Sequence, residues 1–200
     1  MREKHIGKTA HQALLVGILL MLLQFTDLQG KDLPYTPVIT PNGSTLPWKM
    51  IDGVKEFHLI VEEIDWEMAP GMTIKAWGYN GRTPGPTIET VEGDQVRILV
   101  TNKLPEPTAV HWHGVFLPSG MDGVQGLTQP GIQPGETFVY EFTLRQHGTQ
   151  MYHSHGDEMT QTGLGSMAFF IYPIRFRVIL AGRQHDRRFQ AASSNLDRAL

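Results

Sequence analysis

Short segments in which hydrophobic and polar residues alternate follow one another through most of the chain. The clearest lies at residues 95–102, QVRILVTN, where Val96, Ile98 and Val100 fall on one face of an extended strand. Residues 138–144, FVYEFTL, alternate in the same way. Since alternation with a period of two is typical of strands with one buried face, we expect β-structure here. Further candidate strands lie at residues 56–64 and 73–81, and residues 165–173 have the pattern of a nearly continuous apolar strand.

Turn-forming residues separate these predicted strands. The chain contains 21 glycines and 13 prolines, and many of them fall between the alternating segments. No segment has a sustained helical period. Seven or so short strands with intervening turns indicate an all-β protein built as a β-sandwich, which we place at residues 55–172. The turn segments are LPSG at 117–120, QPGIQPGE at 129–136, RQHG at 145–148 and the Pro/Gly stretch at 82–89.

The first 30 residues have the pattern of an export signal. A positively charged start with Arg2, Lys4 and Lys8 precedes the apolar stretch at residues 13–25. This stretch is short for a membrane span, which needs about 20 residues; an uncleaved anchor is the alternative interpretation. We therefore expect a signal peptide at residues 1–30, an extended Pro-rich leader at residues 31–54, and a periplasmic or extracellular location.

The charge is small overall and unevenly distributed. A formal net charge of −3 gives no basis for nucleic-acid binding. Residues 31–172 carry 8 Lys and Arg against 16 Asp and Glu, whereas residues 173–200 carry 6 Arg against 2 Asp. Because the last segment reverses the sign of charge and loses the alternating pattern, we expect an atypical basic tail outside the fold. It is either a genuine tail or sequence foreign to the domain.

Four of the nine histidines are arranged in two His-x-His pairs: His111 with His113, and His153 with His155. Residues i and i+2 of a strand point to the same face, so each pair directs two imidazoles one way. If the two strands are neighbours, all four converge. Imidazole is a ligand for copper, zinc, iron and nickel, so the pattern predicts a metal site.

Several motifs resemble, in order and spacing, the first plastocyanin-like domain of the multicopper oxidases. The resemblance covers about residues 55–172 and implies a Greek-key β-sandwich of the cupredoxin type. It also implies copper as the cofactor and a reaction in which substrate oxidation is coupled to the reduction of oxygen to water. The motifs are NGRTPGPTIE at 80–89, VHWHG at 110–114, MDGV at 121–124, LTQPGIQPGETFVYEF at 127–142 and GTQMYHSH at 148–155.

The same resemblance implies a role for each site residue. His111 corresponds to a ligand of the type 2 copper, and His113, His153 and His155 correspond to ligands of the paired type 3 coppers. Asp122 corresponds to an acidic residue beside the copper ligands that helps to deliver protons during oxygen reduction. An Asp-Gly pair is equally typical of a simple turn, and both interpretations of Asp122 stay open.

Two elements of the family pattern are missing from these 200 residues. The HxxHxH and HCHxxxH motifs, which complete the copper cluster, do not occur, and there is no cysteine to bind a type 1 copper. We therefore expect a domain that contributes half of a type 2/type 3 cluster and is inactive alone. The remaining His and Cys ligands would come from another chain or domain, and the chain has the pattern of a truncated product.

Two other functions are compatible with the sequence. One is an exported, non-enzymatic protein that binds or buffers copper, with Met68 and Met72 adding thioether ligands for Cu(I). The other is a zinc enzyme of the carbonic-anhydrase kind, in which one His-x-His pair and a third histidine hold the metal. The second pair would have no role in that enzyme. Metal analysis distinguishes zinc from copper.

Overall fold

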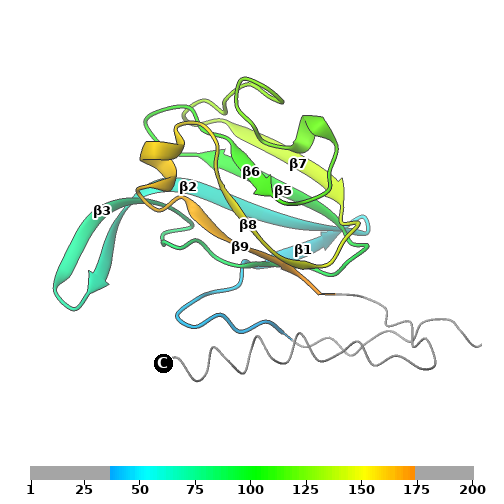
Figure 1. Ribbon diagram of the computed structural model, residues 1–200, viewed down its shortest axis with the longest axis horizontal. Coiled ribbons are helices and arrows are strands. Elements are labelled where there is room, and N and C mark those ends of the chain that lie inside the picture. The colour runs from blue at the N-terminus through cyan, green and yellow to red at the C-terminus, as the bar shows by residue number, and fades with distance from the viewer. Residues whose placement is uncertain (1–36, 174–200) are drawn as a thin grey trace, which may run out of the picture. The chain divides into compact units, whose positions relative to one another are not determined.

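A computed structural model describes residues 37–173 of the chain (Figure 1). The predicted signal peptide at residues 1–30, the first residues of the predicted leader, and all of the predicted basic tail after Pro173 lie outside the described residues. The described part contains a 3₁₀ turn, Ser119–Met121, and a short π-helix, Glu158–Thr162 (η2). Its strands are β1 (Trp48–Ile51), β2 (Val54–Ala69), β3 (Met72–Tyr79), β4 (Ile88–Glu89), β5 (Gln95–Asn102), β6 (Val110–His113), β7 (Thr137–Thr143), β8 (Gly148–Ser154) and β9 (Met167–Tyr172).

These strands form two sheets that pack as a sandwich, which confirms the predicted all-β class. One sheet has the order β1-β2-β5-β7, with β3 added beside β2. The other has the order β4-β9-β8-β6. Strands β2 and β5 are parallel, as are β4 and β9, so each sheet also contains a crossover between strands that are distant in sequence. Within residues 37–173 no helix is long and apolar enough to cross a membrane.

The alternation in the sequence correctly identified the side chains that fill the space between the sheets. Val96, Ile98 and Val100 of β5 are completely buried, and the neighbouring strand β7 buries Tyr140 and Phe142. Strand β5 begins and ends where the pattern predicted it, at residues 95–102. Alternation predicts the buried side chains of β5 and β7 correctly because each strand buries one face and leaves the other in contact with water.

The first long strand extends further than its pattern predicted. Residues 56–64 were expected to form it, whereas β2 runs from Val54 to Ala69. The additional length pairs with β3 in an antiparallel hairpin that projects beyond the sandwich (Figure 1). Met68 and Met72 lie at its tip and are more than half exposed. The hairpin belongs to the five-stranded sheet, whereas His111, His113 and His153 lie on strands of the four-stranded one, and His155 directly follows β8.

Part of the predicted leader is integrated in the sandwich. Strand β1 lies within residues 31–54 and pairs with β2, and Leu46 just before it is buried in the core. The segment is therefore only partly irregular, because its last residues extend the first sheet.

The four-stranded sheet positions the histidines. Strand β6 pairs with β8, and β8 pairs with β9, all antiparallel. Trp112 of β6 and Tyr152 of β8 point into the core, where both are completely buried. Because side chains alternate along a strand, the residues on either side of them point outward. His111, His113 and His153 therefore share the outer face of this sheet.

Candidate metal centre

Strand pairing places the two His-x-His motifs side by side. His111 lies directly opposite His153 across β6 and β8, and His113 lies opposite Met151. Directly opposite residues in an antiparallel pair have Cβ atoms about 4.5–5.5 Å apart, close enough for imidazoles to meet. The predicted convergence is therefore seen for His111, His113 and His153.

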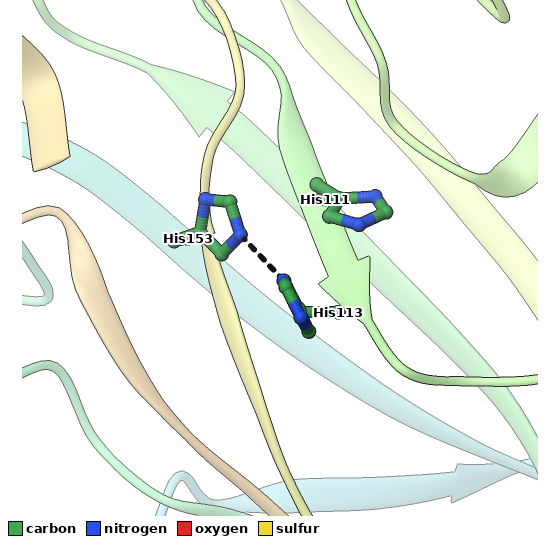
Figure 2. A group of neighbouring side chains, drawn as sticks. All are labelled: His111, His113 and His153. Atoms are coloured by element: carbon green, nitrogen blue, oxygen red, sulfur yellow. Dashed lines mark hydrogen bonds between the residues drawn. The ribbon is translucent and has the colours of Figure 1, made fainter. Parts of the chain in front are cut away.

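Three of the four histidines form a compact group. One potential ligand atom from each of His111, His113 and His153 lies within 4.8 Å of the other two. Nδ1 of His113 and Nε2 of His153 are 3.3 Å apart and form a hydrogen bond. Figure 2 shows these two rings pointing toward one another from adjacent strands, with His111 beside them. His153 is buried, His111 is partly buried and His113 is exposed, so the group opens to the surface on the His113 side.

The separation between His113 and His153 suits two ligands of one metal ion. Metal–imidazole bonds are about 2.0–2.1 Å long, and two such ligands in a tetrahedral arrangement lie about 3.3–3.4 Å apart. The observed 3.3 Å between the two nitrogens has that value. Since Nδ1 of His153 donates to the Ser154 carbonyl, Nε2 of His153 accepts a hydrogen bond from Nδ1 of His113, and an ion bound between the two rings would replace that proton.

A backbone carbonyl orients His111. Its Nδ1 lies 2.7 Å from the carbonyl oxygen of Asp122. Because a carbonyl oxygen can only accept a hydrogen bond, Nδ1 carries the proton and donates it. The lone pair is then on Nε2, which leaves that atom available to a metal.

His153 is held in the same tautomer. Its Nδ1 donates to the carbonyl oxygen of Ser154 at 2.8 Å, which leaves the lone pair on Nε2. Burial lowers the pKa of His153 below its ordinary value, and the nearby His111 adds to this effect. The ring is therefore neutral at neutral pH, the form that binds metals.

His155 stands beside the group of three but is engaged elsewhere. It follows the end of β8, and its ring centre lies 5.3 Å from that of His111. Its Nε2 is 2.9 Å from a carboxylate oxygen of Glu158 in η2. For Nε2 to bind a metal, the Glu158 carboxylate must give up this contact. No feature of the sequence pattern had singled out Glu158.

Asp122 reaches the site mainly through its backbone. Its carbonyl oxygen makes the 2.7 Å contact with His111, whereas the nearest carboxylate oxygen is 3.5 Å from the same nitrogen. The following residue, Gly123, has a positive φ of 81° and approaches the backbone of Val110 closely. Asp122 thus lies in a turn and beside a predicted copper ligand at once.

A buried polar network supports β8 from the side opposite the histidines. Gln161 of η2 is completely buried and accepts hydrogen bonds from the hydroxyl groups of Thr108 and Ser154. Its amide nitrogen donates to Glu106 and to the carbonyl of Pro107. This network ties η2, and with it Glu158, to the end of β8. Its members are ordinary polar residues without a recognisable spacing, so sequence reasoning missed it.

The other described histidines have no part in the site. His58 bonds to Thr101 on the five-stranded sheet, and His147 lies 3.3 Å from Glu92. Both contacts are with residues outside the group of three. They provide matched positions at which a histidine can be removed without touching the candidate metal ligands.

Comparison with known families identifies the domain. The sequence model of a family described as multicopper oxidase matches residues 60–173, more than half of the chain. The matched range contains both His-x-His pairs and ends at the last residue that the structure describes.

Curated relatives carry names from copper biology. The chain is 45% identical over 109 residues to a copper resistance protein A homolog of Pseudomonas syringae pathovar tomato, covering 54% of this chain and 18% of that protein. It is 35% identical over 144 residues to an L-ascorbate oxidase of Nicotiana tabacum, covering 66% of this chain and 25% of that protein. The chain thus spans about a fifth to a quarter of the length of these relatives.

Solved structures agree with this grouping. A multi-copper oxidase from Pseudomonas thermotolerans is 39% identical with a TM-score of 0.60, over 62% of this chain and 30% of that one. A multicopper oxidase from Campylobacter jejuni, described as a metallo-oxidase, is 32% identical with the same TM-score, over 72% of this chain and 31% of that one.

Proposed function

We propose that this chain, which belongs to the multicopper oxidase family and corresponds to the N-terminal cupredoxin domain of that family, binds copper through His111, His113, His153 and His155. The observation that carries this proposal is the 3.3 Å separation between Nδ1 of His113 and Nε2 of His153. Two imidazole nitrogens at that distance suit a shared ion, and copper is the metal that the family implies.

The four histidines would supply half of a type 2/type 3 copper cluster. In this arrangement His111 is a type 2 ligand, and the other three are type 3 ligands. Copper, when bound, supplies one-electron chemistry and a binding place for oxygen. The chain's own contribution is to orient the imidazoles of His111 and His153 through the carbonyl oxygens of Asp122 and Ser154, each of which accepts from an Nδ1.

The remaining ligands would come from another domain or chain. The matched part covers 18% and 25% of the two relatives described above, whose names are a copper resistance protein A homolog and an L-ascorbate oxidase. In a complete enzyme the reaction would be oxidation of a substrate coupled to reduction of oxygen to water. The Asp122 carboxylate, 3.5 Å from a nitrogen of His111, would help to deliver protons there. Alone, the domain would bind copper without turnover.

A second candidate is a non-enzymatic, exported copper-binding protein. The observation that favours it is the absence of cysteine from all 200 residues, combined with relatives named copper resistance proteins. Export is supported by the positively charged start and the apolar stretch at residues 13–25. A copper buffer needs only the histidines that this domain already holds.

Metal titration of the full chain tests the copper assignment. Cu(II) should bind more tightly than Zn(II), in keeping with the general order of affinities for nitrogen sites. His113→Ala and His153→Ala should each weaken Cu(II) binding at least about tenfold, since each removes one of two facing ligands. His147→Ala is the matched control and should leave the affinity unchanged. Equal Cu(II) affinity in all three variants would contradict the proposal.

A further inference from the structure

We propose that Met151 and Met167 extend the histidine group into a mixed imidazole–thioether site for Cu(I). This inference rests on the proposed copper function and deepens it by assigning the oxidation state that the methionines serve. It concerns two methionines that lie within a quoted motif and a predicted strand but to which the sequence had assigned no role.

The strand register places both methionines directly beside the histidines. Met151 of β8 is the cross-strand partner of His113, and Met167 of β9 is the cross-strand partner of His153. Cross-strand partners share one face of a sheet, so both thioethers lie on the outer face with the imidazoles. Met151 and His153 also share that face because they are two residues apart in β8.

The result is a small grid of side chains on the outer face of the four-stranded sheet. One row across β6, β8 and β9 contains His113, Met151 and Phe169. The next row contains His111, His153 and Met167. Each methionine is therefore the cross-strand neighbour of one of the two histidines whose nitrogens are 3.3 Å apart. No acidic residue belongs to these two rows.

The chemistry of the grid favours reduced copper. Thioether sulfur is a soft ligand that selects Cu(I), whereas imidazole binds both oxidation states. If His113 and His153 bind one ion in a tetrahedral arrangement, two further positions around that ion stay open. Met151, opposite His113 and two residues before His153, is the nearest soft donor in the register.

Burial distinguishes these methionines from four others in the described part of the chain, whereas Met121, also partly buried, packs against the core and accepts a hydrogen bond from the backbone N–H of Glu141. Met151 and Met167 are partly buried, while Met50, Met68, Met72 and Met159 are more than half exposed. A sheltered thioether loses less conformational freedom when it binds an ion than a freely moving one. The hairpin methionines proposed from sequence as Cu(I) ligands, Met68 and Met72, lie on strands of the other sheet.

The experiment compares Cu(I) and Cu(II) affinities of the full chain. Cu(I) affinity is measured anaerobically by competition with a chromophoric chelator, and Cu(II) affinity by a parallel competition. The variants are Met151→Leu, Met167→Leu and the double substitution, with Met68→Leu/Met72→Leu as the matched control. Leucine is close to methionine in volume and apolar character, so the fold should be retained; thermal unfolding checks this.

We expect the double variant to lose Cu(I) affinity by at least about tenfold while its Cu(II) affinity changes less than about threefold. The hairpin control should change neither. X-ray absorption of the Cu(I)-loaded wild-type chain should show sulfur scattering that the double variant lacks.

Unchanged Cu(I) affinity in the double variant, or equal losses of Cu(I) and Cu(II), would overturn the thioether assignment. His153→Ala separates the two levels of the argument. If that variant keeps both ions at wild-type affinity, the proposed copper function itself fails. If it loses both ions while the double methionine variant keeps Cu(I), only the further inference fails.

Discussion

The Nδ1 atom of His113 and the Nε2 atom of His153 face one another at 3.3 Å across the neighbouring strands β6 and β8. The two residues are 40 positions apart in sequence, and the sheet alone brings them together. His153 lies on β8, which is paired on both sides, and His113 lies on β6, which pairs with β8. The site is thus held on rigid strands, which favours precise ligand geometry.

His153 and His155 should differ in their contributions to copper affinity. His153 faces another histidine, whereas Nε2 of His155 is 2.9 Å from the Glu158 carboxylate. We expect His153→Ala to weaken the first Cu(II) bound at least about tenfold and His155→Ala to weaken it less than about threefold. Isothermal titration with each variant measures this. Glu158→Gln should bring no loss, and a larger effect of His155→Ala than of His153→Ala would contradict the geometry.

Asp122 and Gly123 should show that the backbone, rather than the carboxylate, orients His111. Asp122→Ala keeps the carbonyl oxygen and should leave Cu(II) affinity within about threefold of wild type. Gly123→Ala should lower both affinity and stability, because φ is 81° and an added Cβ would clash with the carbonyl oxygen of Val110.

The matched control for the glycine is Gly126→Ala. Gly126 has a similar φ of 79°, but an added Cβ would meet nothing within 4 Å. It should therefore show only the cost of the backbone conformation, about 1–3 kcal/mol in the free energy of unfolding. Gly123→Ala should exceed it in a denaturant titration. If both variants lost the same free energy of unfolding, the backbone near Val110 would accommodate the added Cβ without cost, contrary to this prediction.

Gln161 should be important for stability although it is far from any motif. Replacing it by alanine removes the acceptor for the buried hydroxyl groups of Thr108 and Ser154. We expect the free energy of unfolding to fall by about 1–3 kcal/mol, the usual cost of unsatisfied buried polar groups. Gln133→Ala, at an exposed position, should change it by less than about 0.5 kcal/mol. Indistinguishable unfolding curves for the two variants would refute a structural role of the network.

Trp112 should act through its volume rather than its indole nitrogen. It lies between the two predicted ligands of β6 in sequence, but its side chain points into the core and is completely buried. Its Nε1 has no hydrogen-bond partner among the described residues. Trp112→Ala should cost about 3–5 kcal/mol in stability. Trp112→Phe should cost less than half as much, because no hydrogen bond is lost. Chemical denaturation measures both, and similar losses would point to a hidden partner for Nε1.

The isolated, copper-loaded chain should lack the intense visible absorption band of a type 1 copper and should not consume oxygen. Intense blue absorption needs a cysteine thiolate bound to copper, and none of the 200 residues is a cysteine. Visible spectroscopy and oxygen uptake with phenolic or diamine substrates, each compared with free copper, check this. A blue preparation that consumes oxygen would contradict the proposed division of ligands.

Local patterns in the sequence were sufficient to predict the fold class and to place His111 and His113 on one face of a strand. Alternation at residues 95–102 correctly predicted a strand that buries Val96, Ile98 and Val100, because one face of a strand depends only on its own residues. The same local rule predicted that His111 and His113 share a face. The extra length of β2 was not predictable in this way, since the end of that strand is stabilised by pairing with β3.

The chemistry of the site was decided by contacts between distant parts of the chain. That His111 lies opposite His153, and Met151 opposite His113, depends on the register between strands, which no single strand encodes. The carbonyl oxygens of Asp122 and Ser154 select the tautomers of His111 and His153, yet every residue has a carbonyl group, so the sequence does not mark these two. The sequence by itself determined which ligand types are present and which of them share a face of one strand, because strand periodicity is local. Only the tertiary structure decided which atoms meet, because register and backbone proximity arise when the strands pair.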